Sequence, residues 1–353
     1  MAKNPTIADV AERAGVSKAT VSAVINDKNT VSEATRRRVR QIINELNYRP
    51  RAAARHRFQG DDEPSIGFVI KEDDNPYYAE ITAGVRRVAA RKGYTLLVAS
   101  SEGSYEAEHQ IIDTMASKDI RGLIITPVLD DKTDLSHIFE LKRRNIPFVL
   151  LEKVRGVQAH LIDIDNVKAS RDIVTHLIKQ GHAHIVHFAG PSYSAHSGER
   201  IEGIRRAFSE SHLAFRDDYI VYAGAHLQDG YETGLAYFNN HKQNRPTAVT
   251  CYNDLVAIGL LRALHELNIR VPEEISVFGF DNIALLDYLP LPLSSVHVPK
   301  VEMGEKAAEV LIQHLESKNP LPLQKVTLEA ELVIRHSTAV PRLDGVAQQI
   351  RRA

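Results

Sequence analysis

The sequence has little cysteine and no long apolar stretch. Its 353 residues contain a single cysteine, Cys251. A disulfide framework is therefore excluded, and a reducing cytoplasm is the expected compartment. Cys251 lies within an apolar run, which is typical of a buried structural thiol rather than a nucleophile. No 18-residue apolar stretch and no signal peptide are present, so we expect neither a membrane protein nor a secreted one.

Motifs for common enzyme chemistry are also lacking. The sequence contains no G-x-G-x-x-G or G-x-x-x-x-G-K-[ST] phosphate loop, no nucleophile elbow and no HExxH motif. Three histidines, His182, His184 and His187, lie close together. However, His184 and His187 point to opposite sides of an expected strand, and no Cys or carboxylate lies nearby at ligand spacing. The sequence thus predicts no catalytic residue, no metal site and no cofactor.

A helix-turn-helix pattern is present near the N-terminus. Apolar residues recur at helical spacing up to Gly15, whose backbone freedom permits a tight turn. Ser17 is a suitable N-cap for a second helix, in which Val21 and Val24 face inward. Ser32 can cap a third helix that completes a small core. Such a motif can place its second helix in the major groove of DNA.

Positive charge is concentrated in the same segment. Of the 44 Lys and Arg in the chain, 12 lie in residues 1–60, together with 5 of the 45 Asp and Glu. The remaining residues therefore carry 32 basic and 40 acidic side chains. A cationic head on an acidic body is suited to binding a polyanion at one end, and we expect that polyanion to be nucleic acid.

The rest of the chain alternates between short apolar runs and amphipathic stretches, which predicts parallel sheets covered by helices on both faces. About 280 residues exceed what one core supports, so two α/β lobes are expected, with a ligand cleft at the carboxyl ends of the strands. Strands are expected at residues 66–70, 94–99, 122–126, 148–151, 184–189, 248–252 and 275–280. Helices are expected at residues 78–92, 107–117, 135–144, 167–180, 255–267 and 301–316.

Two motifs carry a resemblance to a known family. Thr6-Ile7-x-Asp9-Val10-Ala11-x-x-Ala14-Gly15-Val16-Ser17-x-x-Thr20-Val21-Ser22, followed by Val31-Ser32-x-x-Thr35-Arg36, resembles the N-terminal signature of the lactose/galactose repressor (LacI/GalR) family. Tyr48-Arg49-Pro50 with Ala54-Arg55 resembles the start of that family's hinge helix. The resemblance covers nearly the whole chain. It implies an N-terminal all-α helix-turn-helix head with a hinge helix, then a two-lobed periplasmic-binding-protein-like α/β body with parallel sheets.

The resemblance also implies a domain organisation. Residues 1–60 would form the DNA-binding domain, with the hinge helix at about 49–58, and residues 61–64 would be a linker. Residues 65–340 would bind an effector and dimerise, and residues 341–353 would be a tail. Lobe 1 would comprise about 65–164 and 294–326, and lobe 2 about 165–293 and 327–340.

A dimeric regulator that reads a pseudo-palindromic operator is implied. By position, Lys18, Ala19 and Ala23 match the base-reading residues of the family, although many members carry Arg where this chain has Ala23. The family's minor-groove leucine falls at Arg57, followed by Phe58. Either Phe58 supplies the wedge, or Arg57 reads a narrowed groove electrostatically. The expected DNA-binding residues are Thr6, Ser17, Lys18, Ala19, Thr20, Ser22, Ala23, Asn26, Arg55, Arg57 and Phe58.

Matching positions in the body imply an effector site. The expected residues are Tyr77, Tyr78, Glu152, Ser194, His196, Arg200, Asn253 and Asp281. For Tyr77 and Tyr78 the alternative is packing at a helix start, and for Arg200 it is a structural ion pair. Asp254 suits a helix N-cap, which would leave Asn253 free to reach the cleft. Arginine, aspartate and asparagine beside aromatic rings favour a sugar or sugar derivative, whose binding would shift the equilibrium between DNA-competent and DNA-incompetent states.

Two other functions are compatible with these motifs. A two-lobed sugar-acting enzyme fused to a DNA-binding head would need an acid and a base in the cleft, and the sequence marks none. An effector-independent architectural DNA binder would leave the cleft residues without a role. The tail lacks heptads, so we expect a homodimer with contacts from lobe 1, including the helix at 301–316. The expected partners are double-stranded operator DNA and a small-molecule effector, without a membrane.

Overall fold

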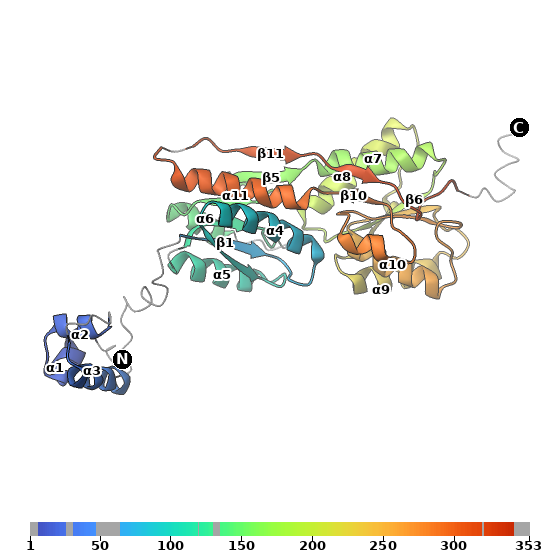
Figure 1. The fold of residues 1–353 in the computed structure, drawn as a ribbon. Coiled ribbons are helices and arrows are strands. Elements are labelled where there is room, and N and C mark those ends of the chain that lie inside the picture. Colours follow the sequence, from blue (N-terminus) through green and yellow to red (C-terminus); the bar gives the residue numbers. More distant parts are fainter. Residues whose placement is uncertain are drawn as a thin grey trace, which may run out of the picture. The chain divides into compact units, whose positions relative to one another are not determined.

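The computed structural model describes residues 6–25, 31–46, 64–118, 120–129, 135–319 and 321–341. It divides the chain into two compact units, Met1–Glu63 and Pro64–Ala353 (Figure 1). The predicted hinge helix, most of the linker and the tail beyond residue 341 lie outside the described residues.

The described residues of the first unit form three helices, α1 (Ile7–Ala14), α2 (Lys18–Ile25) and α3 (Glu33–Glu45). Gly15 has a φ of 64°, so it takes the left-handed conformation that ends α1. Ser17 Oγ accepts a hydrogen bond from the backbone N–H of Thr20 at 3.0 Å, as expected for a cap of α2. Val10, Val21 and Val39, one from each helix, are fully buried. The predicted helix-turn-helix with a third supporting helix is confirmed.

Lobe 1 of the second unit is built on a six-stranded parallel sheet. Its strand order is β11-β5-β4-β3-β1-β2. The strands are β1 (Ser65–Ile70), β2 (Thr95–Ser100), β3 (Ile120–Ile125), β4 (Phe148–Leu150), β5 (His160–Ile164) and β11 (Lys325–Leu328). The helices are α4 (Pro76–Arg91), α5 (Tyr105–Ser117), α6 (Ser136–Arg143) and α11 (Lys300–Glu316).

Successive residues of β1 pack in two different hydrophobic cores, one on each face of the lobe 1 sheet. Phe68 packs in the cluster that contains α4 and α11, whereas Val69 packs in the cluster that contains α5 and α6. Because successive side chains point to opposite faces of a sheet, each face is covered by its own helix pair. On one face α4 and α11 approach closely, since a Cβ atom added to Gly84 would lie 2.0 Å from the carbonyl oxygen of Val301 (Figure 1).

Lobe 2 contains a four-stranded parallel sheet in the order β7-β6-β8-β9. The strands are β6 (Ile185–Ala189), β7 (Ile220–Tyr222), β8 (Ala248–Cys251) and β9 (Ser276–Phe278). The helices are α7 (Asn166–Lys179), α8 (Ala195–Glu210), α9 (Leu227–Asn240) and α10 (Asp254–Glu266), with short 3₁₀ turns at Asp217–Tyr219 and Ala284–Tyr288. Helix α7 packs on α8, and α9 packs on α10. The predicted two-lobed α/β body with parallel sheets is thereby confirmed.

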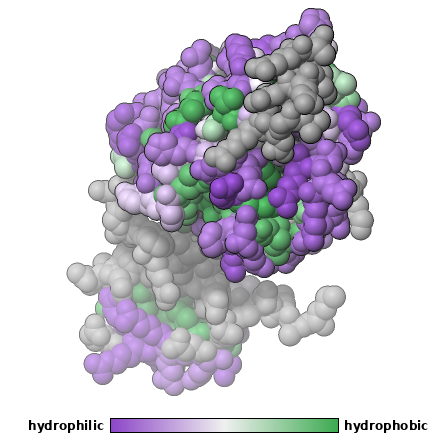
Figure 2. All heavy atoms as spheres, turned by 90° about the vertical axis from the view of Figure 1, so that its right-hand side faces the viewer, coloured by the Kyte–Doolittle hydropathy of each residue, from purple (hydrophilic) through white to green (hydrophobic). Residues whose placement is uncertain are grey.

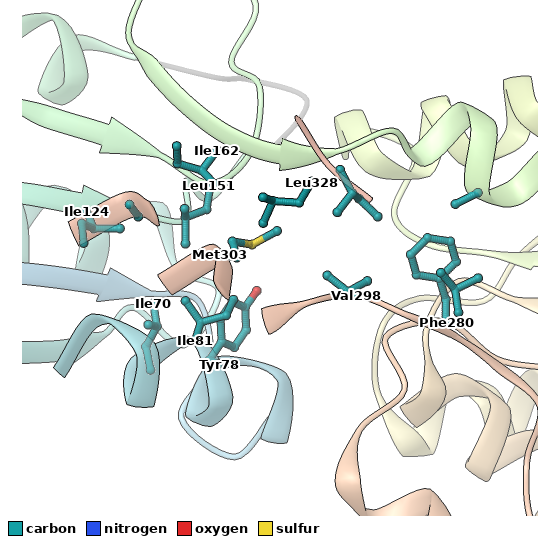
Figure 3. Close-up of a cluster of buried hydrophobic side chains, with 14 of the residues drawn as sticks. Ile70, Tyr78, Ile81, Ile124, Leu151, Ile162, Phe280, Val298, Met303 and Leu328 are labelled. Carbon is teal, nitrogen blue, oxygen red and sulfur yellow. The ribbon is translucent and has the colours of Figure 1, made fainter. Parts of the chain in front are cut away.

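The chain passes between the lobes three times. It crosses between β5 and α7, between β10 (Ser295–His297) and α11, and between β11 and β12 (Glu331–Val333). β10 and β12 form a short antiparallel pair. Figure 3 shows buried side chains continuing through this region, from Met303 beside the lobe 1 sheet, through Val298, to Phe280 in lobe 2.

Five strands, β5, β7, β10, β11 and β12, were not predicted from the sequence. β7, β10 and β12 have three residues each and, unlike the equally short β4 and β9, are not buried along their whole length. β5 contains the polar residues His160 and Asp163. The suggestion that the helix at 301–316 supplies a dimer contact gains no support. The apolar side chains of α11 are buried against α4 and the lobe 1 sheet. Cys251 is 1% exposed, so the expectation of a buried thiol is confirmed, and burial raises its pKa.

The surface of the body at the lobe 2 end is largely hydrophilic, with hydrophobic side chains gathered in a few patches (Figure 2). Among the described residues, no helix combines the length and the apolarity that crossing a membrane requires.

Candidate functional site

A cavity of about 440 Å³ lies between the two lobes. It is lined by residues that follow β1, β3 and β4 in lobe 1 and β6, β8 and β9 in lobe 2, as expected for a site at the carboxyl ends of parallel strands. All eight side chains that the sequence suggested for an effector site line this cavity. They are Tyr77, Tyr78, Glu152, Ser194, His196, Arg200, Asn253 and Asp281.

Four helices begin at the wall of the cavity. Asn75, Ser194, His226 and Asn253 are the N-cap residues of α4, α8, α9 and α10, and all four line the cavity. Asn75 Oδ1 accepts from the backbone N–H of Tyr77 at 3.1 Å. Because the N-terminus of a helix carries a partial positive charge, the wall favours electron-rich ligand atoms such as hydroxyl oxygens.

Asn253, and not Asp254, is the N-cap of α10. Asn253 Oδ1 accepts from the backbone N–H of Val256 at 2.9 Å, and its Nδ2 donates to the carbonyl oxygen of Ala225 at 2.8 Å. Asp254 is fully buried and accepts from Ser295 Oγ at 2.6 Å and from the N–H of Ile283 at 2.9 Å. The sequence-based assignment of the two residues was therefore wrong. The helix begins one residue earlier than expected, and Asp254 at its first position bonds to the 281–283 loop and to Ser295 instead.

Arg200 extends from α8 and is held rigidly. It is 5% exposed, and its Nε donates to Asn166 Oδ1 at 3.1 Å while its Nη1 donates to the carbonyl oxygen of Tyr252. Its guanidinium carbon lies 3.5 Å from the centroid of the Phe280 ring. A stacked and hydrogen-bonded guanidinium loses little entropy when its remaining edge binds a ligand.

Asp281 presents its carboxylate to the cavity. The residue is 7% exposed, and its carboxylate accepts no hydrogen bond from the residues that the structure describes. Its φ of 107° is a strained conformation for a residue other than glycine. The loop is fixed by buried Lys300, whose Nζ donates to the carbonyl oxygens of Asp281 and Asn282 at 2.6 and 3.0 Å. Burial raises the pKa of Asp281, and Arg200 and Lys300 offset this only in part.

Glu152 and His196 connect the lobes electrostatically. Glu152 of lobe 1 pairs with Lys71, and Ser194 Oγ of lobe 2 donates to Glu152 Oε1 at 3.3 Å. Burial alone would raise the pKa of Glu152, but Lys71 and His196 lower it to about 2. Burial alone would lower the pKa of His196, but the carboxylates of Asp163 and Glu152 raise it. Burial, together with the charge of Asp163, raises the pKa of Glu199.

Several cavity residues were missed in the sequence. Lys71 and Glu72 follow directly after β1, so the rule that ligands lie beyond the carboxyl ends of strands could have found them. Tyr193 and Tyr252 lie within motifs that carry the family resemblance, but they had no assigned role. The carboxyl residues of the lining are Glu72, Glu102, Glu152, Asp229 and Asp281, against the two cations Lys71 and Arg200. The cavity therefore has an excess of acidic side chains.

The first unit presents the predicted DNA-reading residues to solvent. Thr6, Ser17, Lys18 and Ala19 are exposed, and Thr20, Ser22 and Ala23 are partly exposed. In the basic run on α3, Arg36 is buried, and the three other arginines are exposed. The predicted residues Asn26, Arg55, Arg57 and Phe58 lie outside the described residues.

Comparisons with known proteins cover both units. Residues 6–51 match the family described as bacterial regulatory proteins, lacI family, and residues 174–338 match the periplasmic binding protein-like domain. The HTH-type transcriptional repressor PurR of Vibrio vulnificus (strain CMCP6) is 35% identical over 336 residues, which is 94% of this chain and 97% of the relative. PurR of Vibrio cholerae serotype O1 (strain M66-2) is 35% identical over 325 residues, 89% of this chain and 92% of the relative.

The chain is also similar to solved structures of transcription regulators. The transcriptional regulator CelR–cellobiose complex is 27% identical with a TM-score of 0.71, and the match covers 94% of this chain and 99% of that one. The lac repressor dimer bound to operator and the anti-inducer ONPF is 26% identical with a TM-score of 0.70, covering 96% and 100%. Sequence, fold and comparisons agree that this chain belongs to the lacI family and is a DNA-binding transcriptional repressor, not an enzyme.

Proposed function

We propose that the cleft binds a small neutral polyhydroxyl molecule, a sugar or a sugar derivative, and that this ligand changes the affinity of the repressor for its operator. The observation that carries the proposal is the convergence of Arg200, Asp281 and four tyrosines on one cavity of about 440 Å³. This volume is within the range of about 300–1,000 Å³ for small-molecule sites. A structural neighbour was solved with cellobiose.

The chemistry of the wall favours hydroxyl groups. The Asp281 carboxylate can accept from a ligand hydroxyl, and the free edge of the Arg200 guanidinium can donate to ligand oxygens. Tyr77 and Tyr78 meet edge to face with ring centroids 5.2 Å apart, so together they offer both apolar faces and hydroxyl groups. The excess of carboxylates disfavours a phosphate or carboxylate group on the ligand. The proposed ligand is therefore an uncharged sugar rather than a sugar phosphate.

A ligand in this cavity contacts both lobes and can therefore change how they are arranged. Tyr77, Tyr78 and Glu152 belong to lobe 1, whereas Ser194, His196, Arg200, Asn253 and Asp281 belong to lobe 2. A ligand held by both sets binds more tightly when the lobes are closed, so it shifts the population towards closure. A reciprocal coupling between ligand and operator follows from linkage.

We further propose that Lys18, Ala19 and Ala23 contact bases and that Thr6, Ser17, Thr20, Ser22 and Asn26 position α2 on the DNA backbone. Lys18 at the first position of α2 is exposed, as a base-reading residue must be. Lys18→Ala should weaken specific binding by about 1–3 kcal/mol and relax preference at one operator position. We also propose that Arg55 contacts DNA. For Arg57 and Phe58 the two hinge alternatives remain, and a DNA bend angle unchanged in Phe58→Ala would eliminate the Phe58 wedge.

A homodimer in the cytoplasm is also proposed. The edge strand β2 exposes Leu97 and Val98 beside an apolar groove that includes Ile111 and Met115 of α5. A second copy of this chain is the occupant that a two-fold operator requires, and the lac repressor neighbour was solved as a dimer. Val98→Glu should convert the dimer to a monomer in analytical ultracentrifugation. An unchanged dimer would exclude this face.

The effector proposal is tested by a thermal-shift screen of neutral mono- and disaccharides, with sugar phosphates for comparison, followed by operator gel shifts with each hit. A ligand at 100 times its Kd should stabilise the protein by about 2.7 kcal/mol. Asp281→Ala should abolish the ligand response and leave operator binding by the ligand-free protein intact. Asp281→Asn tests the charge with a residue that tolerates positive φ, and Asp217→Ala, an exposed aspartate, serves as the control. Normal release of an Asp281 variant by the ligand would refute the assignment.

A further inference from the structure

Asp163, His196 and Glu199 converge where lobe 1 meets lobe 2. Each side chain has one potential metal-ligand atom, a carboxylate oxygen or an imidazole nitrogen, that lies within 4.8 Å of the corresponding atoms of the other two. His196 Nε2 lies 3.1 Å from Asp163 Oδ2. Among the described residues, no other group of three His, Cys, Asp or Glu side chains meets the same distance limit.

The convergence follows from the local structure. His196 and Glu199 are three residues apart on α8, so they share one face of the helix. Asp163 is the penultimate residue of β5 and is 8% exposed. β5 belongs to the lobe 1 sheet and α8 to lobe 2, so the two ligands on the helix face the third across the junction of the lobes.

We propose that Asp163, His196 and Glu199 form a site for a divalent cation, Zn²⁺ or Mn²⁺, that bridges the two lobes. An imidazole nitrogen with two carboxylate oxygens is a ligand set that both cations accept. Metal–ligand bonds of about 2.0–2.2 Å place neighbouring ligand atoms roughly 3.0–3.5 Å apart. The Asp163–His196 pair already has this separation at 3.1 Å, and the Glu199 carboxylate lies within 4.8 Å of both.

Both carboxylates are oriented by hydrogen bonds that leave an oxygen free. Asp163 Oδ1 accepts from the backbone N–H of Ile164 at 2.8 Å, which turns Oδ2 towards His196. Glu199 Oε2 accepts from Asn166 Nδ2 at 3.2 Å, and Asn166 Oδ1 in turn accepts from Arg200. Outer hydrogen bonds of this kind are typical of metal sites, where they fix the ligands before the ion arrives.

The site is open to the cleft on one side. His196 lines the effector cavity, so an ion bound to it has a path from solvent and a coordination position that faces the cavity. Three protein ligands and one open position are the arrangement of zinc sites that bind an exogenous molecule. Because the ligands come from both lobes, a bound cation favours the closed arrangement of the body.

The test is isothermal titration of the full-length, tag-free protein with ZnCl₂ and MnCl₂, without sugar or DNA. One ion per chain is expected to bind. Asp163→Asn and Glu199→Gln should each weaken binding by at least about 10–100-fold, since even the loss of a residue that only orients a metal ligand has this effect. His109→Gln is the matched control because it removes an exposed imidazole 3.6 Å from Asp113, and binding should remain unchanged.

A crystal grown with Zn²⁺ should show an anomalous peak about 2.0–2.2 Å from His196 Nε2. Equal weakening by His109→Gln, binding that both site variants retain while circular dichroism shows them folded, or an anomalous peak elsewhere would overturn the proposal. Glu199 is partly exposed, so Glu199→Gln provides a folded variant even if Asp163→Asn destabilises the junction. Since neither DNA nor sugar is present, the result is independent of the proposed effector.

Discussion

The ion pair between Lys71 and Glu152 allows a quantitative prediction for the stability of the body. The Glu152 side chain is 3% exposed and that of Lys71 is 21% exposed. Glu152→Gln leaves a largely buried ammonium group without its charge partner, which costs about 3–5 kcal/mol. Since 1 kcal/mol shifts Tm by about 2–4 °C in proteins of about 150–250 residues and by less in larger ones, the lower figure predicts a fall of up to about 6–12 °C.

A double-mutant cycle separates the pair from its surroundings. Lys71→Met should cost at least as much as Glu152→Gln, because it leaves the more deeply buried Glu152 carboxylate without its charge partner, although the hydrogen bond from Ser194 Oγ remains. The double variant Lys71→Met/Glu152→Gln removes both charges and should be more stable than Glu152→Gln alone. The measurement is thermal unfolding of ligand-free protein at pH 7 by calorimetry and circular dichroism. Losses that simply add, or a Glu152→Gln Tm within about 1 °C of the parent, would refute the reasoning.

Two further predictions concern groups buried away from solvent. Burial and the nearby Asp281 raise the pKa of Asp254 from 3.8 to about 8, so the native state binds a proton that the unfolded state has lost, and stability falls as pH rises from about 4 to 8. Asp254→Asn keeps an oxygen that can accept from the Ile283 N–H, and its amide group can donate to Ser295 Oγ, so its Tm advantage should grow through this window. Exposed Asp217→Asn should give a curve parallel to the parent, and parallel curves for both variants would contradict the prediction. Gly84→Ala should destabilise by about 1–3 kcal/mol because its Cβ would meet the backbone of α11 at 2.0 Å. The control is Gly198→Ala, because nothing lies within 4 Å of the new Cβ, and it should stabilise the protein by about 0.5–1 kcal/mol. If both variants change the free energy of unfolding in the same direction in chemical denaturation, the close packing of α4 on α11 does not require glycine at position 84.

Local patterns in the sequence were sufficient for the helix-turn-helix and for most of the body. Gly15 and Ser17 set the turn and the cap of α2 through their own backbone and side-chain preferences, which need no distant partner. The long buried strands β1 and β3 were equally clear, because both faces are covered and the apolar runs are continuous. The three-residue strands β7 and β12 lack the complete burial of the equally short β4 and β9, which were predicted.

Local sequence patterns predict some features of the candidate site and leave others open. The position of Asp281 after a strand could be predicted, because strand ends define the ligand cleft. The sequence does not predict whether Asn253 or Asp254 caps α10, since the cap depends on a one-residue difference in where the helix begins. The base-reading role of Lys18 and the hinge residues remain predictions.

From the sequence alone, the helix-turn-helix, seven of the twelve strands of the described residues and the strand ends at which a ligand would lie could be predicted. Which side chains meet depends on the folded chain: Lys71 with Glu152, Ser194 with the opposite lobe, and Asp163 with His196 and Glu199. Helix and strand preferences act over a few residues and leave a periodic signal in the sequence. Contacts between residues 33 to 81 positions apart form only when the strands of one sheet assemble, as for Lys71 and Glu152, or when the chain crossings bring the two lobes together, and no local pattern records them.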